Sequence, residues 1–191
     1  LLVLSSDHEI KDQDKFLNVI NQGIKYALSE KIVTFGIVPT SVETGFGYIE
    51  TEKNTDKNKI TIGKTVKNFI EKPNLENAKK FSQDSRYLWN SGMFLFKAKT
   101  ILDEVEKFSP DIPDACKKSI DKSYSDLDFQ RIDNDAFSKC PNLSIDIAVM
   151  ENTEKGIVLP LEAGWSDIGS WEAVWENCKK DKNGNHLKGK V

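Results

Sequence analysis

Two aspartates lie where a metal ion could join distant parts of the chain. Asp7 comes just after the apolar residues 1–4, and Asp167 lies between Gly164 and Gly169. Ligands of open α/β sheets collect beyond the carboxyl ends of the strands, so a carboxylate after a buried strand is well placed. Mg²⁺ takes one or two protein carboxylates and completes its shell with water and phosphate oxygens. The pair predicts a Mg²⁺ site, although a turn or helix-cap role is an equally good interpretation of each aspartate alone.

A second group of residues suits a sugar phosphate. Glu71 could accept hydrogen bonds from sugar hydroxyls while the adjacent Lys72 meets phosphate charge. The amide of Asn90 both donates and accepts, as recognition of a hydroxyl requires. Gly47 permits a close backbone approach to a ligand. The alternatives are a solvated Glu–Lys pair and, at Asn90, a turn at the entry of a strand.

Other site types are excluded by the residues present. The chain has two histidines, His8 and His186, which are too few for a multi-histidine zinc site. It contains no Gly-x-Ser-x-Gly nucleophile elbow and neither of the two common glycine-rich phosphate-binding patterns. Its cysteines, Cys116, Cys140 and Cys178, are odd in number and far apart, which favours a reducing cytoplasm over a disulfide framework.

Composition indicates a globular domain that does not bind nucleic acid or membranes. The 191 residues carry a net charge of −3, and acidic and basic residues are interspersed along the chain instead of forming blocks. No apolar run approaches the roughly 20 residues that span a bilayer. We expect residues 1–191 to form a single catalytic domain. The sequence does not decide between a monomer and a homo-oligomer.

The elements that must position these residues begin with a β-α-β pattern. Residues 1–4 are typical of a fully buried strand of a parallel sheet, 11–30 of an amphipathic helix and 32–38 of a strand rich in β-branched residues. Such a unit predicts a right-handed crossover in an α/β sheet. A loop at 45–50 enters another strand, and a polar, hairpin-like connection at 53–59 leads to a strand at 60–70.

The remaining pattern alternates helices and strands. It predicts a short helix at 75–82 beginning near Asn74, and residues 88–96 as an entry turn followed by an apolar strand. Helices follow at 98–108, at 112–119 with breaks at Pro110 and Pro113, and at 126–137. A short element at 144–150, a strand at 156–161, a turn at 164–170 and a helix at 171–180 complete the domain. Residues 183–191 resemble a turn into further structure, so we expect a portion of a longer chain.

Several motifs occur together in a diagnostic order. Those at the two ends of the chain are Ser5-Ser6-Asp7-His8 and Gly164-Trp165-Ser166-Asp167-Ile168-Gly169-Ser170-Trp171. Between them lie Gly36-Ile37-Val38-Pro39-Thr40, Glu43-Thr44-Gly45-Phe46-Gly47-Tyr48-Ile49, Phe69-Ile70-Glu71-Lys72-Pro73, Trp89-Asn90-Ser91-Gly92-Met93-Phe94 and Ser144-Ile145-Asp146. Over nearly its whole length the chain resembles the guanylyltransferase of the bifunctional mannose-6-phosphate isomerase/mannose-1-phosphate guanylyltransferase type.

The resemblance implies a Rossmann-like nucleotidyltransferase fold, with a mixed, mainly parallel sheet flanked by helices and incomplete at its N-terminal end. It implies that Asp7 and Asp167 bind Mg²⁺ and that Lys72 faces the sugar phosphate. Asp146 lies in a family motif without an assigned role. GTP and mannose 1-phosphate are the implied substrates, and GDP-mannose, a precursor for polysaccharide biosynthesis, is the implied product.

The resemblance also assigns the sugar contacts and the reaction. Glu71 and Asn90 match residues that hold the sugar, and Gly47 supplies backbone contacts. A phosphate oxygen of mannose 1-phosphate attacks the α-phosphorus of GTP and releases pyrophosphate. Catalysis is then positioning and charge neutralisation, and the attacking oxygen is already ionised, so it needs no general base.

The sequence departs from the family at several points. The glycine-rich signature that carries the triphosphate and base contacts is absent, so little activity is expected of these residues alone, and base choice is open. The isomerase part is absent too, and we expect no isomerase activity here. Ser5, Val42 and Ile147 replace an expected proline, proline and tyrosine.

Three other functions compete with this interpretation. The first is transfer to another sugar 1-phosphate or from another nucleotide. The second is a non-catalytic sugar-phosphate-binding module, which would not need both Asp7 and Asp167. The third is a metal-dependent glycosyltransferase, which would carry Asp-x-Asp after a strand where this chain has Asp7-His8.

Overall fold

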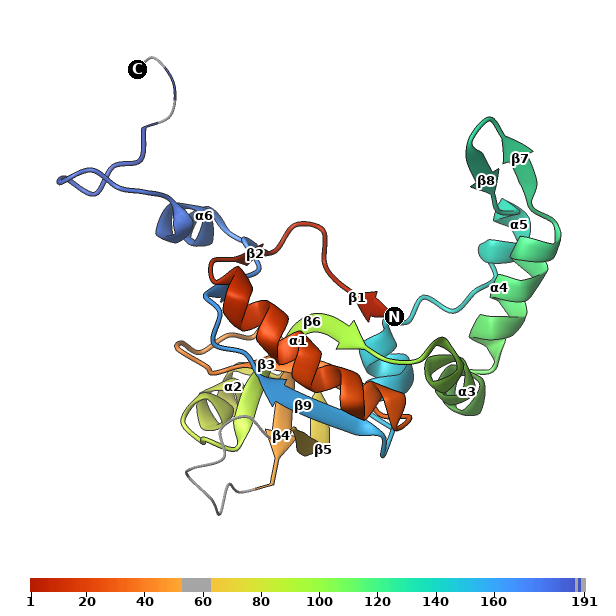
Figure 1. The fold of residues 1–191 in the computed structure, drawn as a ribbon, viewed down its shortest axis with the longest axis horizontal. Coiled ribbons are helices and arrows are strands. Elements are labelled where there is room, and N and C mark those ends of the chain that lie inside the picture. Colours follow the sequence, from red (N-terminus) through yellow and green to blue (C-terminus); the bar gives the residue numbers. More distant parts are fainter. Residues whose placement is uncertain (53–62, 188, 190–191) are drawn as a thin grey trace.

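The computed structural model describes residues 1–52, 63–187 and 189, and Figure 1 shows the arrangement of its elements. The strands of the main sheet are β1 (Leu2–Val3), β3 (Ile32–Ile37), β4 (Tyr48–Thr51), β5 (Lys64–Ile70), β6 (Tyr87–Leu95) and β9 (Gly156–Pro160). Two ribbons are formed by β2 (Glu9–Ile10) with β10 (Trp165–Ser166) and by β7 (Tyr124–Asp126) with β8 (Phe129–Arg131). The helices are α1 (Gln13–Leu28), α2 (Leu75–Ser82), α3 (Ala98–Phe108), α4 (Asp111–Asp121), α5 (Asn134–Phe137), the π-helix η1 (Asp146–Met150) and α6 (Trp171–Asn177).

The main sheet is mixed, as predicted, but it is not mainly parallel. Its order is β1-β6-β3-β9-β5-β4, and among the described strands only β3 and β9 pair in parallel. The long strand β6 pairs antiparallel with β1, β3 and β4. Since β6 lies between β1 and β3, these two strands point the same way without being neighbours. The predicted crossover is therefore split by β6.

The first strand contradicts the prediction of full burial. Residues 1–4 are 39–68% exposed, because β1 is short and has a described neighbour, β6, on one side only. An apolar run of this length is typical of an interior strand, but burial depends on what packs against both of its edges and faces.

Alternating residues of β3 divide the core between the two faces of the sheet. Val33 and Phe35 pack with residues of α1 such as Ala27, whereas Ile32 packs with residues of η1 and with α3. A period of two is expected for a strand that is buried on both faces. The predicted helices 75–82 and 98–108 are confirmed, and the Asn74 side chain accepts from the Asn77 backbone to cap α2.

Three local predictions are wrong. Residues 126–137 form the β7–β8 hairpin and α5, not one helix, because Leu127 adopts a positive φ of 53° in the turn and Asp133 caps a new helix. Residues 89–92 lie inside β6, not in a turn. Pro113 lies in the first turn of α4, where a missing N–H breaks no helical hydrogen bond. The connection predicted at 53–59 lies outside the described residues.

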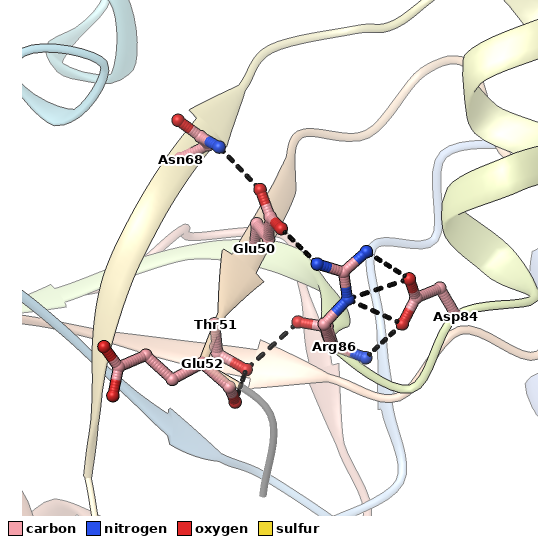
Figure 2. Close-up of polar contacts among 6 residues, drawn as sticks. All are labelled: Glu50, Thr51, Glu52, Asn68, Asp84 and Arg86. Carbon is pink, nitrogen blue, oxygen red and sulfur yellow. Dashed lines mark hydrogen bonds and ion pairs between the residues drawn. The ribbon is translucent and has the colours of Figure 1, made fainter.

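Two further features of the fold lie away from β3 and its core. Residues 111–140, which we call the arm, project from the sheet and follow α3 (Figure 1). A polar network at one end of β4 joins Glu50 to Arg86 and Asn68, and Arg86 to Asp84 (Figure 2). In the part of the chain described, no helix is long and apolar enough to cross a membrane.

Candidate functional site

Strand pairing brings the predicted sugar-binding residues together. Tyr48 pairs with Ile70 on β5 and with Trp89 on β6, so the residue before it, Gly47, lies beside Glu71 and Asn90. The Asn90 backbone N–H donates to the Gly47 carbonyl at 2.7 Å. A Cβ added to Gly47 would lie 2.6 Å from Glu71 Oε2 and 3.3 Å from Asn90 Cβ. Glycine at this position is what lets the Glu71 side chain lie against the strand.

The amide of Asn90 is held from both sides. Thr34 Oγ1 donates to Asn90 Oδ1 at 3.0 Å, and Asn90 Nδ2 donates to Asp146 Oδ1 at 3.0 Å. The two contacts together fix the orientation of the amide, with its second Nδ2 hydrogen outside both bonds. Asp146, which the sequence left without a role, belongs to this group. It reaches the site from the start of η1, on the face of the sheet opposite α1.

Two carboxyl groups share this small region with one lysine. Burial raises the pKa of Glu71, and the nearby Asp146 carboxylate raises it further. Burial likewise raises the pKa of Asp146. Lys72 Nζ lies 3.4 Å from Glu71 Oε1 and offsets part of this charge. A carboxyl group accepts from the hydroxyls of a polyol when it is ionised and can also donate to them when it is protonated.

Strained backbone occurs at the Glu71-Lys72 turn and at the turn that contains Asp167. Lys72 has a φ of 45°, and Ile168, directly after Asp167, has a φ of 52°. Positive φ is uncommon outside glycine and is a clear outlier for a β-branched residue such as Ile168. Strained backbone of this kind clusters at binding and catalytic sites, where the surrounding structure maintains it. The strain therefore supports functional roles for the turns that carry Glu71-Lys72 and Asp167.

The β2–β10 ribbon places the backbones of the two predicted metal ligands at the same end of the ribbon. Ser166 pairs antiparallel with Glu9, so Asp167 leaves β10 at the end where Asp7 precedes β2. A Cβ on Gly169 would lie 2.5 Å from Asp167 Oδ2, so the glycine leaves room for this carboxylate. Two carboxylates offer the hard oxygens that suit Mg²⁺. Among the described residues no group of three or more His, Cys, Asp or Glu is placed to hold a metal, so substrate oxygens and water would have to complete the shell.

Aromatic side chains connect the acid pair to the sugar-binding group. Trp165 Nε1 donates to His8 Nδ1 at 3.2 Å, and the Trp165 ring meets Phe46 edge-on at 5.7 Å between centroids. Phe46 in turn meets Trp89 edge-on at 5.1 Å. Phe46, Trp89, Trp165 and Asp167 all line a cavity of about 1060 Å³. Its lining includes neither Glu71 nor Asn90, so the cavity and the predicted sugar-binding residues adjoin at Trp89.

Sequence reasoning did not predict this aromatic series, because Phe46, Trp89 and Trp165 lie far apart in the sequence. The glycines on either side of Phe46 were the available signal, since they let the backbone carry a large ring to the edge of a cavity. Asp146 was missed as a member of the site because its partner Asn90 lies far from it in the sequence.

Comparison with known proteins identifies the family. The model of the nucleotidyl transferase family matches residues 1–184. The chain belongs to this family. It is 49% identical over its full length to a mannose-1-phosphate guanylyltransferase of Salmonella montevideo, covering 41% of that protein. It is 44% identical over its full length to the xanthan biosynthesis protein XanB of Xanthomonas campestris pv. campestris (strain B100), covering 40% of it.

A solved structure supports the fold. The crystal structure of mannose-6-phosphate isomerase from Helicobacter pylori aligns with a TM-score of 0.77 at 35% identity, over 87% of this chain and 63% of that one. The predicted nucleotidyltransferase-like α/β fold is confirmed. The chain spans about two-fifths of the length of the curated relatives it matches.

Proposed function

We propose that the protein containing this chain transfers GMP from GTP to mannose 1-phosphate, giving GDP-mannose and pyrophosphate. The observation that carries the proposal is the group formed by Glu71, Asn90 and Asp146 beside Lys72. It combines hydroxyl-binding groups with one cation, which is the chemistry of a sugar phosphate. The similarity to proteins named mannose-1-phosphate guanylyltransferase selects the sugar and the nucleotide.

Each residue has a role in this proposal. Glu71 and Asn90 bind sugar hydroxyls, while the backbone at Gly47 approaches the ring closely. Lys72, whose side chain is 65% exposed, meets the sugar phosphate. Asp7 and Asp167 would hold Mg²⁺, which when bound neutralises phosphate charge. The phosphate of mannose 1-phosphate is its own nucleophile, so the protein aligns it with the α-phosphorus of GTP and holds both anions in place.

The test measures pyrophosphate release from GTP and mannose 1-phosphate with Mg²⁺ by the full-length protein and two variants. We expect Asp167→Asn to lower kcat/KM by about 100-fold or more, because it removes a charged ligand from the phosphate site. Asp103→Asn is the control, since Asp103 makes only an exposed helical ion pair with Lys99 in the structure. Its kcat/KM should stay within about twofold of the parent.

Substrate controls separate the alternatives. Faster release with ATP or glucose 1-phosphate than with GTP and mannose 1-phosphate would indicate a nucleotidyltransferase of different specificity. A folded full-length protein that binds mannose 1-phosphate but releases no pyrophosphate would refute the proposal in favour of a sugar-phosphate-binding module.

A further inference from the structure

A fully buried hydroxyl lies behind the Asn90 amide. It belongs to Thr34 on β3, which pairs with Phe94 on β6 and with Val158 on β9. Within the described part of the chain this hydroxyl makes one hydrogen bond, in which Thr34 Oγ1 donates to Asn90 Oδ1 at 3.0 Å. A valine of nearly the same shape would avoid burying a hydroxyl at this position. The Thr34 hydroxyl thus has one partner, and that partner belongs to the candidate site.

An irregularity in β6 brings the two side chains together. The register between β3 and β6 shifts between Thr34 and Gly36, and Asn90 pairs with Gly36. A single β3 residue therefore opposes residues 91–93 of β6, where Gly92 has a φ of 70°. Because Gly36 has no side chain, nothing on β3 separates Asn90 from Thr34, which lies on the same face of the sheet. Bulges next to functional sites re-aim side chains in this way.

The contacts on the two sides of the Asn90 amide give it one polarity. A carboxylate only accepts hydrogen bonds, so Nδ2 must face Asp146, to whose Oδ1 it donates at 3.0 Å. Oδ1 then points towards the buried Thr34 hydroxyl. The group that the amide keeps for a ligand is its second Nδ2 hydrogen, which is a donor. Without the Thr34 hydroxyl, Oδ1 would lose its protein partner and would need one from a ligand or from water.

We propose that Thr34 is a positioning residue for the sugar: its hydroxyl binds Oδ1 and holds Asn90 as a hydrogen-bond donor to one sugar hydroxyl. This role rests on the proposed function, in which Asn90 binds the sugar. The sugar hydroxyl keeps its own hydrogen for a carboxylate, and Glu71 lies beside Asn90 across Gly47. A hydroxyl bound in both directions is distinguished from a hydrogen atom at the same carbon, so Thr34 contributes to the choice of sugar without touching it.

The test measures the Kd of mannose 1-phosphate by isothermal titration calorimetry with the full-length protein and its variants. Thr34→Val removes the hydroxyl and keeps the side-chain shape, so we expect the Kd to rise about tenfold, the worth of one hydrogen bond. Thr34→Ala should show a similar rise. Thr34→Ser keeps the hydroxyl, and its Kd should stay within about threefold of the parent value.

Thr51→Val is the matched control for these variants. Thr51 is also a buried strand threonine, and its Oγ1 donates to the Arg86 carbonyl at 3.1 Å, at the end of β4 away from Gly47. The substitution removes a buried hydroxyl from the same sheet, so it should lower the melting temperature without changing the Kd of mannose 1-phosphate.

Analogues of mannose 1-phosphate that each lack one hydroxyl show whether Thr34 acts through Asn90. The analogue without the hydroxyl that Asn90 binds has no such contact to lose, so Thr34→Val should bind it within about twofold of the parent. The other analogues should keep the tenfold difference. A purely structural role would weaken all analogues by the same factor. That result would overturn the proposal, as would an unchanged Kd of mannose 1-phosphate in Thr34→Val.

The binding measurement also separates this proposal from the proposed function. A parent protein that binds mannose 1-phosphate but releases no pyrophosphate refutes the transfer of GMP, and the Kd values still decide the role of Thr34. A parent protein that releases pyrophosphate, with a Thr34→Val variant that binds mannose 1-phosphate equally well, refutes the role of Thr34 alone. A folded parent protein that does not bind mannose 1-phosphate refutes both.

Discussion

The two ends of β4 carry polar clusters of the same composition, two acids, one amide and one cation, in which the cation is placed differently. At the end near Thr51 lies the outer cluster of Glu50, Asn68, Asp84 and Arg86 (Figure 2). The Glu50 side chain is only 11% exposed, but Arg86 Nη1 lies 2.8 Å from its Oε1, and the Asn68 amide donates to its other oxygen. Arg86 also binds Asp84, whose carboxylate raises the pKa of the guanidinium. Each described carboxylate of this cluster has a cationic partner.

The other end of β4 begins next to Gly47 and carries the site cluster of Glu71, Lys72, Asn90 and Asp146. It too contains two acids, one amide and one cation, but Lys72 approaches Glu71 only from an exposed position. Both acids have raised pKa values, chiefly through burial.

The outer cluster stabilises the sheet, whereas the site cluster leaves polar groups less fully paired. The outer cluster satisfies its buried carboxylate with fixed protein donors, so it holds the ends of β4, β5 and β6 in register. In the site cluster the Asn90 amide keeps one hydrogen outside its bonds to Thr34 and Asp146, and the two acids share one exposed lysine; the proposed function assigns these groups to a sugar. Functional sites typically give up stability in this way.

Replacing the amide in each cluster should give the largest difference between the clusters, and that difference should be in kcat/KM. Asn90→Asp removes the donor to Asp146 and sets a second carboxylate against it, so we expect kcat/KM for pyrophosphate release to fall by about 100-fold. Asn68→Asp makes the same change beside Glu50, where it should change kcat/KM by less than about twofold. Steady-state kinetics of the two full-length variants measures both. Equal losses of activity would show that the clusters do not differ in function.

Replacing the cation in each cluster should produce the reverse pattern in stability. Arg86→Met leaves Glu50 with a buried, poorly paired charge, and we expect the free energy of unfolding to fall by about 2 kcal/mol. Lys72→Met removes an exposed side chain and should change it by less than about 0.5 kcal/mol. Urea denaturation measures both values. A comparable loss in Lys72→Met would mean that the site cluster depends on its own ion pair for folding.

The local sequence pattern was sufficient to predict a residue's position where that position depends only on the helix or strand that contains it. Helix 75–82 has an Asn74 cap and helical spacing, and Gly47 and Glu71 lie at strand ends that the sequence could delimit. Asn90 lies inside β6, where the sequence placed a turn. The assembly of the three residues into one site was implied by the family resemblance, and the antiparallel register of β4 supplies its physical basis.

Tertiary context decided what the sequence could not. The exposure of β1 depends on what pairs with its edges, and the hairpin at Tyr124–Arg131 depends on a positive φ at Leu127 that no local pattern announces. The contact between Asn90 and Asp146 joins β6 to a π-helix across the fold. The inclusion of Asp146 in the site, and the balance of charge around it, therefore required the three-dimensional structure.

The smallest expected effect is on the pH dependence of the melting temperature when an acid of either cluster is replaced by glutamine. The pKa of Glu71 is raised in the fold, so the native state keeps a proton that the unfolded chain has already released. Wild-type stability is therefore lost as the pH rises from the ordinary glutamate pKa, about 4.3, through the raised folded value. Glu71→Gln cannot titrate, and we expect its melting temperature relative to wild type to increase between about pH 4 and pH 7.5.

Glu50→Gln provides the matched comparison for this titration. It removes a carboxylate that Arg86 and Asn68 hold, so its melting temperature at about pH 7.5 should lie below that of the wild type. Because Glu71 interacts with Asp146, the gain in Glu71→Gln includes relief of the Asp146 carboxylate and belongs to the pair. Differential scanning fluorimetry across this pH range measures both variants. If Glu71→Gln instead loses stability as the pH rises, Glu71 is held by Lys72 as firmly as Glu50 is by Arg86, and the site cluster is a structural network like the outer one.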